Sequence, residues 1–350
     1  MAENVALIAG ARGICGRALV EHLDDDPAWE VIGISRGPKD FSAGARFIAL
    51  DLLDRAACEA VLGNLSHVTH VFFNAVTRPS TAAQKAEEAL AILVNLIEVI
   101  EPVAANLKHV QLMQGTNWYG SHLGPFPTPA GEDDPRMMPP NFYYPQHDWL
   151  VERRKGKSWT WSGLRPHGVY GFSSANPVSH LNGLALYGAI SKELGLPLRF
   201  PGRPGHFERI YQFTDARHLA KGMVWAATSP GAADAAFNFT NGDFQRWCNL
   251  WPMIADFFAI PAGPVQTIPL AAMMADKEPL WAEMGRKYGL RETQLADLVD
   301  WGFNERIWAT EFDQLSSMNK ARKAGWTGVV DSAEMLLRLL GEMRETRIIP

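Results

Sequence analysis

The sequence predicts an α/β protein with a doubly wound parallel sheet, helices on both faces and a smaller mixed C-terminal region. Two observations predict this fold. Short apolar strands alternate with helices through residues 1–165, which is typical of a parallel sheet. The first strand, at 5–9, leads directly into Gly10-Ala11-Arg12-Gly13-Ile14-Cys15-Gly16, and a helix follows. Strand, glycine loop and helix in this order favour a nucleotide phosphate cradle over an ordinary turn.

The three glycines have separate roles in such a Rossmann cradle. We expect Gly10 to take the tight turn, Gly13 to let the backbone approach a pyrophosphate, and Gly16 to let the helix pack on the strand. The second strand ends at Ser35-Arg36, where an NAD site would carry an acid. Arg36, with Arg12 as a second positive charge, therefore favours NADP(H); a solvated surface arginine is the alternative.

Further strands are expected at 46–50, 70–75, 109–113 and 159–164, with helices near 53–62, 82–107 and 143–153. Ligands of such sheets bind beyond the carboxyl ends of the strands, so these ends should form one crevice. The residues expected to bind the cofactor are Gly10, Arg12, Gly13, Ile14, Gly16, Ser35, Arg36, Asp51, Leu52, Asn74, Ala75, Val76, Gln114, Gly115, Thr116, Tyr143, Pro166, Gly168 and Val169. Asp51 is expected to bind the adenine amino group, to cap the helix starting near Leu53, or both.

The second half of the chain mixes helices with short strands. Helices are expected at 181–194, 216–228, 248–258 and 332–346, and strands at 198–200, 237–239 and 266–268. We therefore expect residues 1–170 to form mainly the nucleotide-binding domain and residues 171–350 mainly a substrate-binding region interwoven with the sheet. The segment 123–141 is rich in proline and glycine and is predicted to be an active-site loop.

Composition excludes several classes of protein. The 350 residues are 47% hydrophobic with a formal net charge of −5, so a large core is expected and nucleic acid is not an expected partner. No membrane span or signal peptide is predicted. Three scattered cysteines fit a reducing cytoplasm. His122, His167 and His180 lack metal-ligand spacing, so no metal is expected.

Several spaced blocks resemble one family. The sequence is similar to the progesterone 5β-reductase and iridoid synthase-like branch of the extended short-chain dehydrogenases, and the resemblance runs nearly end to end. The blocks that carry it are the glycine loop, Asn141-Phe142-Tyr143-Tyr144 with Asp148, Arg165-Pro166 followed by Gly168, and residues 238–243, 277–281, 317–320 and 348–350.

The resemblance implies NADPH-dependent reduction of the C=C bond of an α,β-unsaturated carbonyl compound. The family's catalytic tyrosine corresponds to Tyr143, whose hydroxyl would bond the carbonyl oxygen; Tyr144 is the fallback. A small apolar enone or carbonyl substrate is expected in an aromatic pocket. The pocket candidates are Trp118, Phe142, Phe172 and Tyr211. The resemblance alone suggests a homodimer.

The sequence departs from this family at two positions. The family's lysine after the fifth strand is replaced by Asn117, and the family's acid after the tyrosine is replaced by His147. A neutral amide cannot lower the pKa of a tyrosine by charge. Either His147 partly replaces the missing cation or Asn117 leaves a weakened or redirected enzyme. The alternatives are therefore 1,2-reduction of a carbonyl, or the reverse alcohol oxidation, and an NADP-binding protein that has weakened or lost catalysis.

Overall fold

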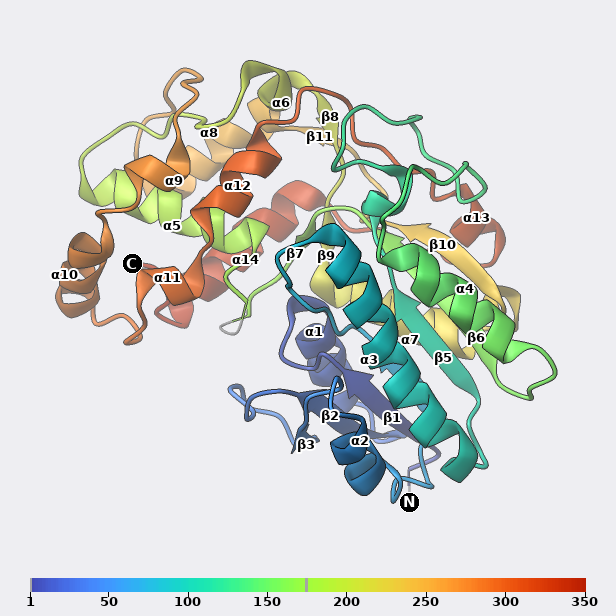
Figure 1. The fold of residues 1–350 in the computed structure, drawn as a ribbon. Coiled ribbons are helices and arrows are strands. Elements are labelled where there is room, and N and C mark those ends of the chain that lie inside the picture. Colours follow the sequence, from blue (N-terminus) through green and yellow to red (C-terminus); the bar gives the residue numbers. More distant parts are fainter. Residues whose placement is uncertain (1, 174–175) are drawn as a thin grey trace. The chain divides into compact units, whose positions relative to one another are not determined.

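The computed structural model describes residues 2–173 and 176–350, and within them the chain divides into two compact units (Figure 1). The first unit comprises the chain up to His167 together with Ala216–Phe239 and Ser316–Thr327. The second comprises Gly168–Asp215, Thr240–Leu315 and Gly328–Pro350. Each unit therefore draws on segments that are far apart in the sequence.

A parallel sheet forms the centre of the first unit and confirms the predicted fold class. The order of its seven strands is β10-β6-β5-β4-β1-β2-β3. The strands are β1 (Asn4–Ala9), β2 (Trp29–Ser35), β3 (Arg46–Ala49), β4 (His70–Phe73), β5 (His109–Met113), β6 (Thr160–Pro166) and β10 (Ala235–Phe239). The chain adds β2 and β3 on one side of β1 and then returns to add β4, β5 and β6 on the other side. The order of strands therefore reverses between β1 and β4, which pair with each other. This switch point is where doubly wound sheets bind ligands.

Helices cover both faces of this sheet. One face carries α1 (Ile14–Asp24) and α7 (Ala216–Thr228), which pack on each other. The other carries α2 (Arg55–Leu62), α3 (Ala82–Val103) and α4 (Tyr143–Arg154); α3 and α4 run in front of the sheet in Figure 1. Shorter elements of this unit are the 3₁₀ turns η1 (Thr116–Tyr119) and η2 (Pro230–Ala232) and the helix α13 (Asn319–Lys323).

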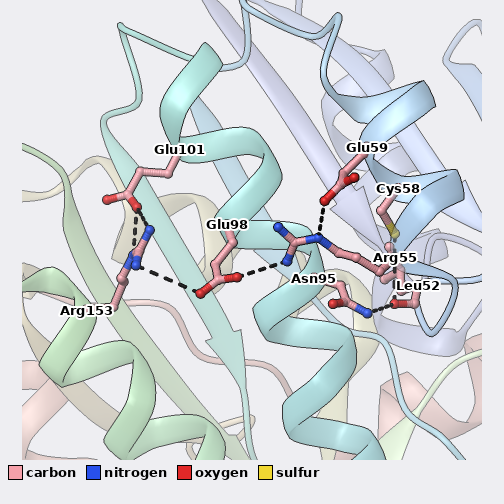
Figure 2. Close-up of polar contacts among 8 residues, drawn as sticks. All are labelled: Leu52, Arg55, Cys58, Glu59, Asn95, Glu98, Glu101 and Arg153. Atoms are coloured by element: carbon pink, nitrogen blue, oxygen red, sulfur yellow. Dashed lines mark hydrogen bonds and ion pairs between the residues drawn. The ribbon is translucent and has the colours of Figure 1, made fainter.

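Charged side chains link the outer surfaces of α2, α3 and α4 (Figure 2). Arg55 bonds Glu59 at 2.7 Å and Glu98 at 2.9 Å. Arg153 bonds Glu101 at 2.7 Å, and its guanidinium lies 4.0 Å from Glu98. These residues pair with one another along the helices, so their role is structural.

The second unit is helical with short strands. Its helices are α5 (His180–Glu193), α6 (Pro204–Glu208), α8 (Trp247–Phe258), α9 (Leu270–Met273), α10 (Glu278–Tyr288), α11 (Leu295–Leu298), α12 (Trp301–Trp308) and α14 (Ser332–Glu345). Its strands are β7 (Val169–Tyr170), β8 (Ile210–Tyr211), β9 (Thr214–Asp215) and β11 (Gln245–Arg246). Aromatic side chains dominate the core of this unit. The ring centroids of Phe200 and Trp251 are 5.0 Å apart, and those of Phe213 and Trp247 are 5.3 Å apart.

Two expected strands are absent from this unit, which corrects the prediction at 198–200 and 266–268. The segments do lie side by side, since Gln266 N donates to Phe200 O at 3.0 Å. However, Pro197, Pro201 and the prolines at 261, 264 and 269 supply no N–H, so no continuous ladder forms. A second correction concerns α2, which begins at Arg55 instead of near Leu53 because Asp54 caps it by accepting from Ala57 N.

Candidate active site

The glycine loop has the geometry of a phosphate cradle. Gly10 has φ +78°, and a β-carbon there would lie 2.7 Å from the backbone of Asn74. A β-carbon on Gly16 would lie 2.3 Å from Gly10 O, so only glycine lets α1 approach the loop this closely. Gly13 is the N-cap of α1 and offers no side-chain cap. The first-turn N–H groups, beginning at Ile14, are therefore available to an anion, which fits the pyrophosphate of a dinucleotide.

An uncommitted amide lies beside this cradle. Asn74 follows β4 at the switch point, and both its Nδ2 and Oδ1 are buried without a hydrogen bond in the described residues. Buried polar atoms normally have partners, so this amide is suited to a ligand hydroxyl or phosphate. Ala75 and Val76 continue the same segment, and Val76 is half exposed at 50%. The segment 74–76 therefore provides the second wall of the expected cofactor site.

Two arginines belong to the segments at the carboxyl end of β2. Arg12 crosses from the glycine loop and lies over Gly37, where a β-carbon would clash with its Nη1. Its Nη2 bonds Asp40 at 3.0 Å. Arg36 follows the last residue of β2 and is exposed, and Ser35 donates to Gly37 O at 2.6 Å. Both cations thus lie at the strand end where the ribose of a dinucleotide is bound in this fold. Gly37 and Asp40 were not predicted from the sequence, because the contact needs the folded loop.

The end of β3 is organised by local hydrogen bonds. Asp51 is exposed and accepts from Leu53 N at 3.0 Å, so it shapes the turn before α2 without being the helix cap. Leu52 is buried, and its carbonyl accepts from Asn95 at 2.8 Å (Figure 2). One oxygen of the Asp51 carboxylate has no protein partner in the described residues and remains available to a ligand.

Tyr143 begins α4, and its hydroxyl reaches the carboxyl end of β5. A β-carbon built on Gly115 would lie 2.9 Å from this hydroxyl and 3.6 Å from the carbonyl oxygen of Pro166, the last residue of β6. Burial, and then the neighbouring Cys15 thiol, raise the pKa of Tyr143 well above its usual value of 10. The phenol is therefore fully protonated near pH 7 and can act as a hydrogen-bond donor.

Asn141 connects Asn117 with Tyr143. The Asn141 Nδ2 donates to Asn117 O at 2.7 Å, and its Oδ1 accepts from Tyr143 N at 3.1 Å. Asn117 Oδ1 accepts from Ser121 Oγ at 3.1 Å, and no hydrogen bond engages Asn117 Nδ2 within residues 2–173 and 176–350. Asn141 was singled out only as part of a motif, yet it positions both candidate catalytic residues.

Tyr144 differs from Tyr143 because the backbone already uses its hydroxyl. It donates to Trp118 O at 2.7 Å and accepts from Met137 N at 2.9 Å. Its ring packs edge-on against Trp118 at 4.9 Å. Tyr144 therefore anchors the loop before α4, which argues against the fallback role.

His147 and Trp118 pack together in the interior of the first unit. Burial, and then the charge of Arg165, lower the pKa of His147 to about 4, so it is neutral near pH 7. This argues against the hypothesis that His147 partly replaces the missing cation. The guanidinium carbon of Arg165 lies 3.8 Å from the ring centroid of Trp118, and that of Arg136 lies 5.0 Å from it. Its faces are covered, which argues against a role in binding substrate.

The side chains of Gln114 and Thr116 are used internally. Gln114 Oε1 accepts from Arg165 Nε at 2.9 Å, and Gln114 Nε2 lies 3.3 Å from His147 Nδ1. Thr116 Oγ1 lies 2.8 Å from His167 Nδ1. At these two positions, only the backbone remains for the expected cofactor contacts.

Four expected site residues belong to the second unit. Gly168 (φ +44°) lies against the Tyr211 hydroxyl, and Val169 begins β7. Tyr211 is buried, with its ring 4.9 Å from Phe213, whereas Phe172 is only partly buried. Tyr211 therefore belongs to the aromatic core of its unit.

The described parts of the chain contain no cluster of three or more histidine, cysteine or acidic side chains suited to a metal ion. None of the helices in those parts combines the length and apolar character needed to cross a bilayer.

Comparisons with known proteins agree with this geometry. A family model described as a PRISE-like Rossmann-fold domain matches residues 50–350. An (S)-8-oxocitronellyl enol synthase of Nepeta racemosa is 34% identical over 367 aligned residues, covering 99% of this chain and 94% of that protein. The 3-oxo-Δ(4,5)-steroid 5-β-reductase of Arabidopsis thaliana has the same identity and coverage. A solved UDP-glucose 4-epimerase of Thermotoga maritima superposes with a TM-score of 0.70 at 16% identity, covering 98% of this chain and 99% of that one.

The sheet, the glycine cradle and a tyrosine at the start of α4 whose hydroxyl reaches the end of β5, together with these relatives, define an oxidoreductase of the extended short-chain dehydrogenase/reductase type. The family match and the 34% identity across nearly the whole chain then make the assignment specific. The chain belongs to the PRISE-like Rossmann-fold family, as the sequence blocks predicted.

Proposed function

We propose that this protein reduces the C=C bond of an α,β-unsaturated carbonyl compound at the expense of NADPH. Two relatives, named as an 8-oxocitronellyl enol synthase and a steroid 5-β-reductase, support this class of reaction. The observation that carries the proposal is the protonated phenol of Tyr143 beside Gly115, at the carboxyl end of the central strands. Bound NADPH would supply the hydride.

Tyr143 is suited to donating a hydrogen bond to the carbonyl oxygen. When the β-carbon of an enone gains hydride, negative charge develops on that oxygen, and a positioned donor stabilises it. Asn117 Nδ2 would be a second neutral donor. Proton transfer from Tyr143 is less favourable, because burial raises its pKa and the Cys15 thiol raises it further. In a 1,4-reduction the hydride goes to the β-carbon and the enolate then takes a proton at the α-carbon from solvent water, so the phenol need only donate a hydrogen bond. This is therefore favoured over a 1,2-reduction, in which an alkoxide must be protonated at the oxygen that Tyr143 faces.

The choice of NADPH over NADH rests on Arg12 and Arg36. Guanidinium groups bind phosphate by charge-assisted hydrogen bonds, and Arg12 is already held over Gly37 at the end of β2. We expect Arg12→Ala and Arg36→Ala each to weaken NADP⁺ binding about 10-fold or more while leaving NAD⁺ binding nearly unchanged. Lys108→Ala, at the opposite end of the sheet, is the matched control. An equal loss of affinity for NADP⁺ and NAD⁺ in these variants would contradict the assignment of NADPH as the cofactor.

The reaction is tested by product analysis. Purified protein would be incubated with NADPH and a panel of enones and enals, and the products identified by mass spectrometry and NMR. A saturated carbonyl product supports the proposal, whereas an allylic alcohol would instead support 1,2-reduction. Tyr143→Phe should lower kcat by roughly 100-fold or more, since it removes the donor. Tyr144→Phe should affect stability more than the pattern of products.

A second candidate is an NADP-binding protein with weakened catalysis. Asn117 in place of the family lysine and the neutral state of His147 favour it, because neither residue contributes a positive charge. Tight NADP⁺ binding without turnover of any enone would identify this case. Asn117→Lys would then be expected to raise the rate.

We further propose a reducing compartment such as the cytoplasm, since Cys15, Cys58 and Cys248 are all free thiols. The homodimer suggested by the family resemblance stays a prediction.

A further inference from the structure

A lysine from the first turn of α3 lies beside the candidate catalytic residues. Lys85 Nζ is 4.2 Å from the ring centroid of Phe142. The Phe142 ring in turn packs on Tyr143, with 4.0 Å between the two ring centroids. Both contacts lie within the first unit. The ammonium group therefore sits next to the aromatic pair that begins α4, although Lys85 is far from it in sequence.

No acid in the described residues neutralises this lysine. Its ammonium group lies over the Phe142 ring and makes no hydrogen bond or ion pair with residues 2–173 or 176–350; its backbone N–H is bonded to Thr81 O at 3.0 Å. Glu88, one turn further along α3, instead accepts from Gln84 at 3.0 Å. Lys85 is also only partly exposed, so water solvates it incompletely. A partly buried ammonium normally has an anionic or hydrogen-bonding partner.

Two more basic side chains interact electrostatically with Lys85. Burial, and then the charge of Arg78, lower the pKa of Lys85. Burial, and then the charge of Lys85, lower the pKa of His122. Lys85 and Arg78 thus repel each other, and Lys85 disfavours protonation of His122. A bound anion would relieve that repulsion and would favour the protonated forms.

Lys85 does not act on the hydroxyl of Tyr143. The pKa of Tyr143 is raised by burial and by Cys15, and no cation among the described residues offsets this rise. The lysine lies against the aromatic rings and leaves the phenol unaffected. A role in binding part of the substrate fits this geometry better than a role in activating the tyrosine.

We propose that Lys85, with Arg78 and His122, forms an anion-binding subsite next to Tyr143, and that the substrate is an enone that carries a carboxylate. This inference rests on the proposed function, because it places the carboxylate on the same molecule as the carbonyl that Tyr143 binds. Lys85 would donate a charge-assisted hydrogen bond to the carboxylate, while the Phe142 ring holds its side chain in place.

Matched substrates test this proposal. Pairs of enones that differ only in a carboxylic acid or its methyl ester would be assayed with NADPH, using wild type, Lys85→Gln and Lys85→Arg. We expect wild type to prefer the acid. Lys85→Gln should raise KM for the acid about 10-fold or more, with kcat and the ester little changed. Lys85→Arg should retain most of the preference. Lys108→Gln, whose lysine bonds Asn4 at 3.0 Å at the far end of β5, is the control.

A binding measurement separates this inference from the proposed function. The saturated acid and its ester would be titrated into the NADP⁺-bound protein by calorimetry, which requires no turnover. Tighter binding of the acid, lost in Lys85→Gln and kept in Lys85→Arg, supports the subsite even if no enone is reduced. Equal affinity of the wild-type protein for acid and ester would overturn the subsite. So would an equal loss of affinity for acid and ester in Lys85→Gln when its melting temperature is unchanged. Reduction of the ester alone would support the proposed function while rejecting the subsite.

Discussion

Asn141 donates a 2.7 Å hydrogen bond from its side-chain amide to the backbone carbonyl of Asn117. The same side chain accepts from the N–H of Tyr143. One buried amide therefore fixes the turn after β5 relative to the start of α4. The positions of the two neutral groups proposed to face the substrate oxygen depend on it.

Replacing this amide should impair catalysis more than folding. Asn141→Ala removes two hydrogen bonds that orient Asn117 and Tyr143, so we expect kcat to fall about 10- to 100-fold in steady-state assays with NADPH. Asn64→Ala, which removes one exposed contact to Ala60 O, is the control. An unchanged kcat for Asn141→Ala would show that the turn is held by other contacts.

The close approach of Tyr143 to Gly115 leads to a second prediction. In Gly115→Ala the new methyl group would meet the end of a side chain, so the Tyr143 hydroxyl should move while the fold persists. We expect kcat to fall about 10-fold or more with little change in melting temperature. Gly341→Ala in α14 has open space and should keep full activity while gaining roughly 0.5–1 kcal/mol of stability. The idea fails if Gly115→Ala retains wild-type kcat.

Buried histidines should make the protein acid-sensitive. His109 bonds Thr160 Oγ1 and Ser162 Oγ, each at 2.8 Å, and burial followed by the charge of His70 lowers its pKa to about 3. The unfolded chain binds this proton near pH 6.5, so stability should fall as the pH drops from about 6.5 toward 3. For one such histidine the loss at pH 5 is about 2 kcal/mol.

Urea unfolding at pH 7 and pH 5 would measure this loss. His109→Gln should be less stable than wild type at pH 7 but should lose less stability on acidification. His67→Gln, at an exposed position, should follow wild type. An identical pH dependence in wild type and His109→Gln would argue against the assignment.

The ion pairs in Figure 2 lead to a prediction about a carboxylate, whose charged form is the stabilising one. Burial alone would raise the pKa of Glu101, but hydrogen bonds from Lys157, Trp159 and Arg153 outweigh it and lower the pKa. The stability that Glu101 contributes is therefore present above its unfolded pKa and lost as pH falls through the folded value. Glu101→Gln should lower stability by roughly 2 kcal/mol at pH 7, and the difference should shrink as the pH falls below 4.5, the ordinary pKa of a glutamate.

Thermal melting of Glu101→Gln and Glu59→Gln across this pH range provides the comparison. The Glu59 side chain is 59% exposed, against 10% for Glu101, so Glu59→Gln should change the melting temperature much less. Similar shifts for both variants would mean that burial of the Glu101 pairs does not matter.

The sequence by itself determined the elements that depend on local order. Gly10, Gly13 and Gly16 follow an apolar strand at spacings that only one kind of turn and helix satisfies, so the cradle could be predicted. The strands of the sheet and the position of Tyr143 at the start of a helix followed in the same way. The predicted strand at 198–200 failed because its neighbouring prolines interrupt a ladder whose partner lies some 60 residues away.

Only the tertiary structure decided which side chains are already engaged. Tyr143 and Tyr144 are adjacent in sequence, but the backbone of Trp118 and Met137 uses one hydroxyl while the other reaches Gly115. His147 is neutral because of what surrounds it, and Lys85 reaches Phe142 only because α3 packs beside α4. Hydrogen-bond partners, burial and long-range charge depend on residues distant in the chain, so local sequence patterns do not contain them.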